Sequence, residues 1–238
     1  MQKKESRITL IVLLLLISFG FGISSMAQEI KPVADSPQFA GTIFTVDIKV
    51  EDIESLFGIS FVFHYTHTDY IDALSVEEGD FLGNEVLWLD PVIDDNQGTV
   101  SIAITRMRPA EGVDGSGVLV KIKLKPSLDT PDPTSVDFDI TEIDAITPER
   151  KLISITPQTL TVTVKDLEGT ITKDTVLIGT YFVKGDIIVP DGVTLEIRST
   201  DSIQTQFLFS GYYKIVAESG STLKILGTPD NPVIFTNE

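Results

Sequence analysis

The protein has 238 residues, no cysteine, two histidines and a formal net charge of −17 at pH 7. A surface this acidic repels nucleic acid and anionic lipid and favours cationic partners or calcium. A chain without cysteine forms no disulfide and cannot be a lipoprotein acylated on cysteine, so its stability must come from burial of apolar side chains.

The first 27 residues have the pattern of a signal peptide. Lys3, Lys4 and Arg7 precede an apolar run over residues 8–23, and small side chains occupy residues 25 and 27. This pattern predicts cleavage after residue 27, and a run of this length is short for the alternative, a single membrane anchor. Residues 1–27 contribute +2, so the mature chain carries −19. We expect a secreted or cell-surface protein with no membrane span after cleavage.

Short strands with two distinct faces follow from Phe39 onward. Over Ile59–Tyr65, Phe61, Phe63 and Tyr65 share one face, and Ser60, Val62 and His64 share the other. Similar segments are Thr42–Val50, Val100–Ile104, Val118–Lys125, Val136–Ile140, Leu152–Ile155 and Thr159–Val164. Turn residues separate them and no helical period persists, which predicts an all-β fold, an antiparallel β-sandwich over residues 28–165.

An internal repeat follows a change of pattern near residues 165–169. Ile188–Ile197 aligns with Val216–Ile225 at an offset of 28 residues, so that Gly192 matches Gly220. A strand, a glycine turn and a second strand, repeated at about the length of one coil, are typical of a β-solenoid. We predict a linker at residues 166–172 and solenoid coils at residues 173–238.

The last twelve residues, Gly227–Glu238, read as a turn and a short strand whose Phe235 has no covering segment after it. Solenoids need about three coils for independent stability, and their terminal coils usually carry a polar cap. The expectation is that this chain is the front part of a longer one. The alternative is that another subunit supplies the missing coil.

Five stretches of the first region resemble a cohesin domain, the module that binds dockerins in cellulosomes and related surface assemblies. They are Gly41–Val50, Gly58–Tyr65, Leu74–Leu82, Gly98–Ile102 and Gly117–Lys125. The resemblance implies a nine-stranded jelly-roll sandwich and a dockerin-like partner. Cohesins usually carry Asp after the tyrosine that ends the second stretch, where this chain has Thr66. Dockerin-contacting positions on that strand are often polar or acidic in the family, and here they are Gly58 and Ser60.

The second region resembles the beginning of a right-handed parallel β-helix. The resemblance is carried by Asp174–Ile187, by Pro190–Leu195 and by the last twelve residues. Such coils occur in carbohydrate-active enzymes and in adhesin-like surface proteins. The stretch includes none of the catalytic coils of those enzymes, and likeness of fold alone assigns no activity.

The sequence offers no catalytic or metal-binding constellation. His64 and His67 have an odd spacing that sends them to opposite faces of an extended strand, and Gly115–Gly117 lacks the spacing of a nucleophile elbow. Asp90–Gly98 could offer oxygen ligands to calcium, but it lacks the alternation of an EF-hand loop and is better interpreted as a solvated turn. No cofactor is expected.

The single tryptophan, Trp88, is either a core residue or a stacking platform for a sugar or partner, and the leucines beside it favour the core.

These patterns predict a non-catalytic secreted attachment module with a dockerin-like protein partner. The predicted partner-binding face consists of Gly58, Ser60, Val62, His64, Thr99, Ser101 and Ala103. The alternatives are a carbohydrate-binding module that contacts polysaccharide directly, and the non-catalytic front part of a carbohydrate-active β-helix enzyme or adhesin.

Overall fold

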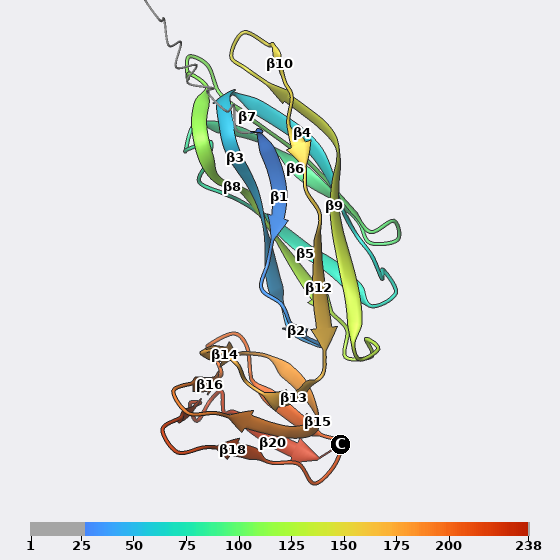
Figure 1. The fold of residues 1–238 in the computed structure, drawn as a ribbon, viewed down its shortest axis with the longest axis vertical. Coiled ribbons are helices and arrows are strands. Elements are labelled where there is room, and N and C mark those ends of the chain that lie inside the picture. The colour runs from blue at the N-terminus through green and yellow to red at the C-terminus, as the bar shows by residue number, and fades with distance from the viewer. Residues whose placement is uncertain (1–26, 238) are drawn as a thin grey trace, which may run out of the picture.

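The structure is a computed structural model that describes residues 27–237, so the predicted signal peptide lies outside the described residues except for Ala27. Every regular element of the described residues is a β-strand (Figure 1). None of the elements in residues 27–237 is a helix of the length and hydrophobicity that a bilayer span requires.

The first half of the chain forms two packed sheets. One sheet has the order β11-β1-β3-β8-β5. Its strands are β1 (Glu29–Val33), β3 (Phe44–Leu56), β5 (Ile71–Glu78), β8 (Val113–Pro126) and β11 (Thr156–Pro157). The other has the order β2-β12-β9-β4-β7-β6, with β10 paired to β9. Its strands are β2 (Gln38–Phe39), β4 (Gly58–Tyr65), β6 (Val86–Asp94), β7 (Thr99–Arg106), β9 (Thr134–Ile146), β10 (Leu152–Ile153) and β12 (Leu160–Lys165).

The core of the sandwich comes from the alternation along these strands. On β4, Phe61, Phe63 and Tyr65 point between the sheets and are almost completely buried, as are Val100, Ile102 and Ile104 on β7. The rings of Phe63 and Phe138 stack with their centroids 5.5 Å apart. Without the two-residue strands β2, β10 and β11, the two sheets hold nine strands, and nearly all pairings are antiparallel. The predicted antiparallel sandwich is confirmed.

Residues 167–237 form two further sheets in which every pairing is parallel, and we call them the parallel-sheet region. One contains β13 (Leu167–Thr170), β15 (Thr180–Val189), β17 (Gln206–Phe209), β18 (Ile215–Ala217) and β20 (Ile234–Asn237). The other contains β14 (Thr175–Leu177), β16 (Thr194–Arg198) and β19 (Thr222–Leu226). The strands of this region run across the long direction of the sandwich in the lower part of Figure 1.

The repeat found in the sequence corresponds to this pairing. Thr194 of β16 is the register partner of Thr222 of β19, at the same offset of 28 residues. The two aligned glycines, Gly192 and Gly220, have φ angles of +76° and +84°. Because side chains other than glycine are strained in this conformation, the turn itself explains the repeated glycine. Inside the region, the Phe207 ring lies 5.2 Å from that of Tyr181, its neighbour on β15.

Residues 166–172 differ from the predicted linker. They contain strand β13, which pairs with β15, and the apolar side chains of Leu167 and Ile171 are buried in the core of the parallel-sheet region. The polar residues around them suggested a connector, but burial of these two side chains makes the segment part of the folded region.

Candidate partner-binding face

The residues predicted to bind a partner lie together on the outward face of the sheet β9-β4-β7-β6. Ser60 pairs with Ala103 across β4 and β7, and His64 pairs with Thr99. Val62 pairs with Ser101 in the same way, and Gly58 lies at the end of the row opposite Thr105. The residues between them are buried in the core, so the small and polar side chains face outward.

Strand β9 extends this face on one side with acidic side chains. Asp144 pairs with Ser60, and Asp139 pairs with His64; both carboxylates are exposed, as is Asp137. The Nε2 atom of His64 lies 2.7 Å from the Oγ1 atom of Thr141. These carboxylates are not among the predicted face residues, although Asp137 and Asp139 alternate with buried residues along β9.

Strand β6 extends the face on the other side with aliphatic side chains. Leu87, Leu89 and Val92 are 50%, 55% and 64% exposed. Leu89 pairs with Ala103, and Val92 pairs with Ser101 on the same face because a register shift lies between Leu89 and Val92.

Trp88 points the other way and packs against the sandwich core. The interpretation of Trp88 as a core residue agrees with this packing, but the neighbouring leucines are no indication of it because they are exposed. Leu87 and Leu89 share the outward face because side chains alternate along a strand, and the same alternation turns Trp88 inward.

A hollow of about 250 Å³ lies where the small residues meet the aliphatic edge. Its lining includes Gly58, Ser60, Ala103, Leu87 and Leu89, and Asp144 of β9 as well. A Cβ atom at Gly58 would lie 2.7 Å from the Oγ1 atom of Thr105, closer than side-chain contacts allow. The face therefore combines an apolar hollow and aliphatic side chains on one side with carboxylates on the other.

The segment Asp90–Gly98 forms the end of β6 and the turn into β7. Asp94 Oδ1 accepts hydrogen bonds from the backbone N–H groups of Asn96 and Gln97, at 3.1 and 3.2 Å. Asp95 Oδ1 accepts hydrogen bonds from the Tyr65 hydroxyl and from the backbone N–H of Ala73, the latter at 2.9 Å. Burial first, and then the hydrogen bond to Asp95, raise the pKa of Tyr65 well above its ordinary value. These carboxylates hold the turn together.

Within residues 27–237 no group of three or more acidic or histidine side chains is placed to hold a metal ion. His64 lies on the outward face of β4, whereas His67 lies beyond the end of that strand with a φ angle of +63°.

Comparison with known proteins identifies the sandwich. The family model for the cohesin domain matches residues 32–163, which is more than half of the chain. The chain belongs to the cohesin domain family. Curated proteins give no significant match.

Solved structures of cohesins resemble the sandwich in fold. A type I cohesin–dockerin complex from Clostridium thermocellum, named Coh-OlpC-Doc435, matches with 15% identity and a TM-score of 0.50 over 58% of this chain and 95% of that chain. A non-cellulosomal cohesin from the archaeon Archaeoglobus fulgidus matches with 16% identity and a TM-score of 0.49 over 58% of this chain and 91% of that chain.

Proposed function

We propose that the protein is a non-catalytic attachment module whose cohesin domain binds a dockerin-type protein module through the outward face of β9-β4-β7-β6. The observation that carries the proposal is the composition of this face. The face joins small side chains around a hollow to the exposed aliphatic residues Leu87, Leu89 and Val92. Protein–protein interfaces combine apolar contact area with polar groups, and this face offers aliphatic side chains along β6 and carboxylates along β9.

The face also indicates the chemistry of the partner. Apolar side chains of the partner would enter the hollow beside Leu89, and basic side chains would meet Asp139 and Asp144. The acidic charge of the whole chain attracts such a partner over a longer range. Because the exposed hydrophobic residues of this face are aliphatic and Trp88 points inward, the face supports a protein partner better than a sugar ring.

We place this module in a secreted or cell-surface assembly concerned with polysaccharide binding or breakdown. The predicted signal peptide supports export, and the cohesin resemblance supports the assembly. We also propose that the parallel-sheet region is the first coils of a right-handed parallel β-helix. The parallel pairing at 28-residue offsets supports that assignment.

One observation favours direct contact with polysaccharide as a second candidate function. The side chain of Tyr212 is fully exposed in the loop between β17 and β18, and Tyr213 beside it is 38% exposed. Exposed tyrosine rings can stack on sugar rings. If this loop binds polysaccharide, Tyr212→Ala will reduce retention on an insoluble polysaccharide and leave dockerin binding unchanged.

The test of the proposed function is a binding survey with the purified protein. Dockerin modules encoded in the source genome are immobilised one by one, and binding is followed by biolayer interferometry; insoluble cellulose and xylan are tested in parallel by sedimentation. We expect saturable binding to at least one dockerin module. Retention on a polysaccharide without binding to any dockerin module would contradict the proposal and favour the carbohydrate-binding alternative.

A further inference from the structure

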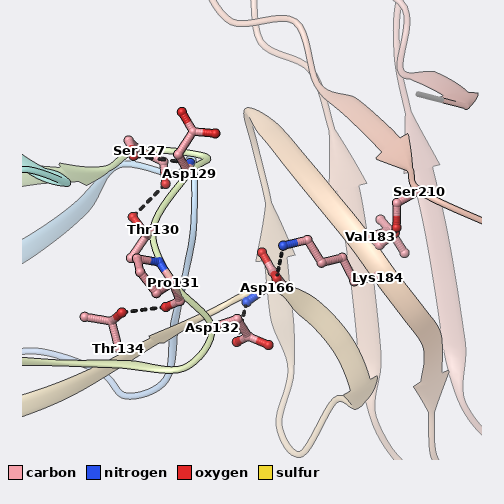
Figure 2. Close-up of polar contacts among 10 residues, drawn as sticks. All are labelled: Ser127, Asp129, Thr130, Pro131, Asp132, Thr134, Asp166, Val183, Lys184 and Ser210. Carbon is pink, nitrogen blue, oxygen red and sulfur yellow. Dashed lines mark hydrogen bonds and ion pairs between the residues drawn. The ribbon is translucent and has the colours of Figure 1, made fainter.

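The cohesin domain and the parallel-sheet region meet with almost no free chain between them. Strand β12 ends at Lys165 and strand β13 begins at Leu167, so only Asp166 separates them. The Asp166 side chain is completely buried, and its Oδ2 atom lies 2.7 Å from the Nζ atom of Lys184 on β15 (Figure 2). Its backbone N–H donates to Oδ1 of Asp132 at 3.0 Å.

Asp166 therefore connects three segments of the chain. Asp132 belongs to the loop between β8 and β9 of the sandwich, which is ordered by its own hydrogen bonds, such as that from the Thr130 hydroxyl to the Ser127 carbonyl at 2.8 Å (Figure 2). Lys184 belongs to the parallel-sheet region. A buried carboxylate is unfavourable unless it is paired, so the fold holds Asp166 and Lys184 together once both regions are in place.

Apolar packing crosses the junction as well. Phe39 lies on β2, which pairs with β12 of the sandwich, yet its side chain packs against the core of the parallel-sheet region. Its ring meets the ring of Tyr181 edge to face, with centroids 6.3 Å apart. At Gly41 the two backbones come so close that a Cβ atom would lie 2.7 Å from the carbonyl oxygen of Thr180.

Two features indicate that the stability of the parallel-sheet region depends on these contacts. Strands β13 and β14 are the first members of their sheets, and each lies at a sheet edge. The buried core of the region consists of ten apolar side chains, a small core for residues 167–237. Terminal units of repeat folds usually carry a cap, and here the sandwich contacts Thr180, Tyr181 and Lys184 of β15.

We propose that the cohesin domain has a second function within the chain: it caps strand β15 of the parallel-sheet region, so that the two regions form one rigid unit. The cap consists of Phe39, Gly41, Asp132 and Asp166. It does not depend on which partner the cohesin domain binds. It fixes the orientation of the partner-binding face relative to the parallel-sheet region.

Hydrogen–deuterium exchange of the full chain tests the cap. Phe39→Ala removes packing on the core of the parallel-sheet region, because Phe39 contacts that core from outside it. We expect amide exchange in β13, β15 and β17 to become about tenfold faster or more, and exchange in β4 and β7 to stay unchanged. Asp166→Asn, which keeps the shape and removes the charge, should accelerate exchange in β15.

A matched control for Asp166→Asn is Glu51→Gln. It makes the same carboxylate-to-amide change in an ion pair with Lys31 on the sandwich, 2.7 Å long and partly exposed. The control should leave exchange in the parallel-sheet region unchanged. Unchanged exchange in both Phe39→Ala and Asp166→Asn would overturn the proposal. Equal acceleration in both regions would overturn it too, because the residues would then support the sandwich itself and not the cap.

The fixed orientation of the two regions can be measured separately. Because the chain has no native cysteine, spin labels attach only at introduced cysteines. Spin labels on cysteines introduced at Thr45 and at Lys224, both exposed, report the distance between the two regions by double electron–electron resonance. We expect a single narrow distance distribution that broadens when Phe39→Ala is added. A broad distribution before that substitution would refute the fixed orientation.

Discussion

Replacing Val62 with arginine should abolish partner binding and leave the cohesin domain folded. Val62 lies in the middle of the candidate face, with Ser101 of β7 on one side and Thr141 of β9 on the other. Its side chain points away from the core, which Phe61 and Phe63 fill. A long charged side chain at this point meets any partner that covers the face.

The expected effects on folding and on binding differ in size. Outward-facing substitutions on a strand change the free energy of unfolding by about 1 kcal/mol or less, which shifts the melting temperature of a domain of this size by roughly 2–4 °C. A guanidinium buried in an interface without a matching anion on the partner costs roughly 3–5 kcal/mol. Since each 1.4 kcal/mol is about tenfold in Kd, binding should weaken by roughly 100-fold to 3,000-fold.

Biolayer interferometry against a dockerin module that binds the unmodified protein measures this loss, and circular dichroism melting checks the fold. Thr45→Arg is the matched control, because Thr45 is also β-branched and faces outward, but it lies on β3 in the opposite sheet. The control should bind normally. If Val62→Arg binds within threefold of the unmodified protein, the outward face of β4 is not the interface.

Three further predictions concern the carboxylates of β9, the core of the parallel-sheet region and stability at alkaline pH. The double substitution Asp139→Asn and Asp144→Asn should lower the association rate constant for a basic partner about tenfold at low salt and much less at high salt. If the effect of the substitutions on this rate does not depend on salt, the electrostatic argument is contradicted. Phe207→Ala should lower the free energy of unfolding of the parallel-sheet region by about 3–5 kcal/mol, because the ring is fully buried. It should remove protection from hydrogen exchange in that region alone, and retained protection there would show that this core does not stabilise the region. Because the pKa of Tyr65 is raised, folding favours its neutral phenol, so stability should be constant below pH 10 or so and fall above it. Tyr65→Phe should make this alkaline fall shallower in urea titrations, and an unchanged slope would show that Tyr65 does not contribute.

Much of the fold and the position of the face can be predicted from local pattern. Along Ile59–Tyr65 apolar and polar residues alternate without interruption, and a period of two fixes which side chains face the core. The repeat likewise predicted which residues pair, because Ile188–Ile197 and Val216–Ile225 belong to neighbouring parallel strands in register at the 28-residue offset. Gly192 and Gly220 recur because each lies in a turn between paired parallel strands and has a positive φ angle.

The aliphatic edge and the junction could not be predicted in this way. Leu87 and Leu89 are as apolar as core residues, and only their pairing opposite outward-facing residues of β7 shows that they face solvent. Phe39 lies in a strand of the sandwich, but its side chain packs against the core of the parallel-sheet region. No local sequence pattern contains such a relation between distant segments. The linker prediction at residues 166–172 failed because a short strand between polar residues resembles a connector.

The register shift on β6 also bears on self-association. Strand β6 is the edge of its sheet, and an exposed edge with aliphatic side chains invites a strand of a second copy to pair with it. Asp90 and Pro91 lie within the interruption between Leu89 and Val92, and Pro91 has no N–H to offer a neighbouring strand. Both features disfavour continuous pairing along this edge. The protein can display aliphatic side chains to a partner that approaches face-on while it resists edge-to-edge aggregation at high concentration.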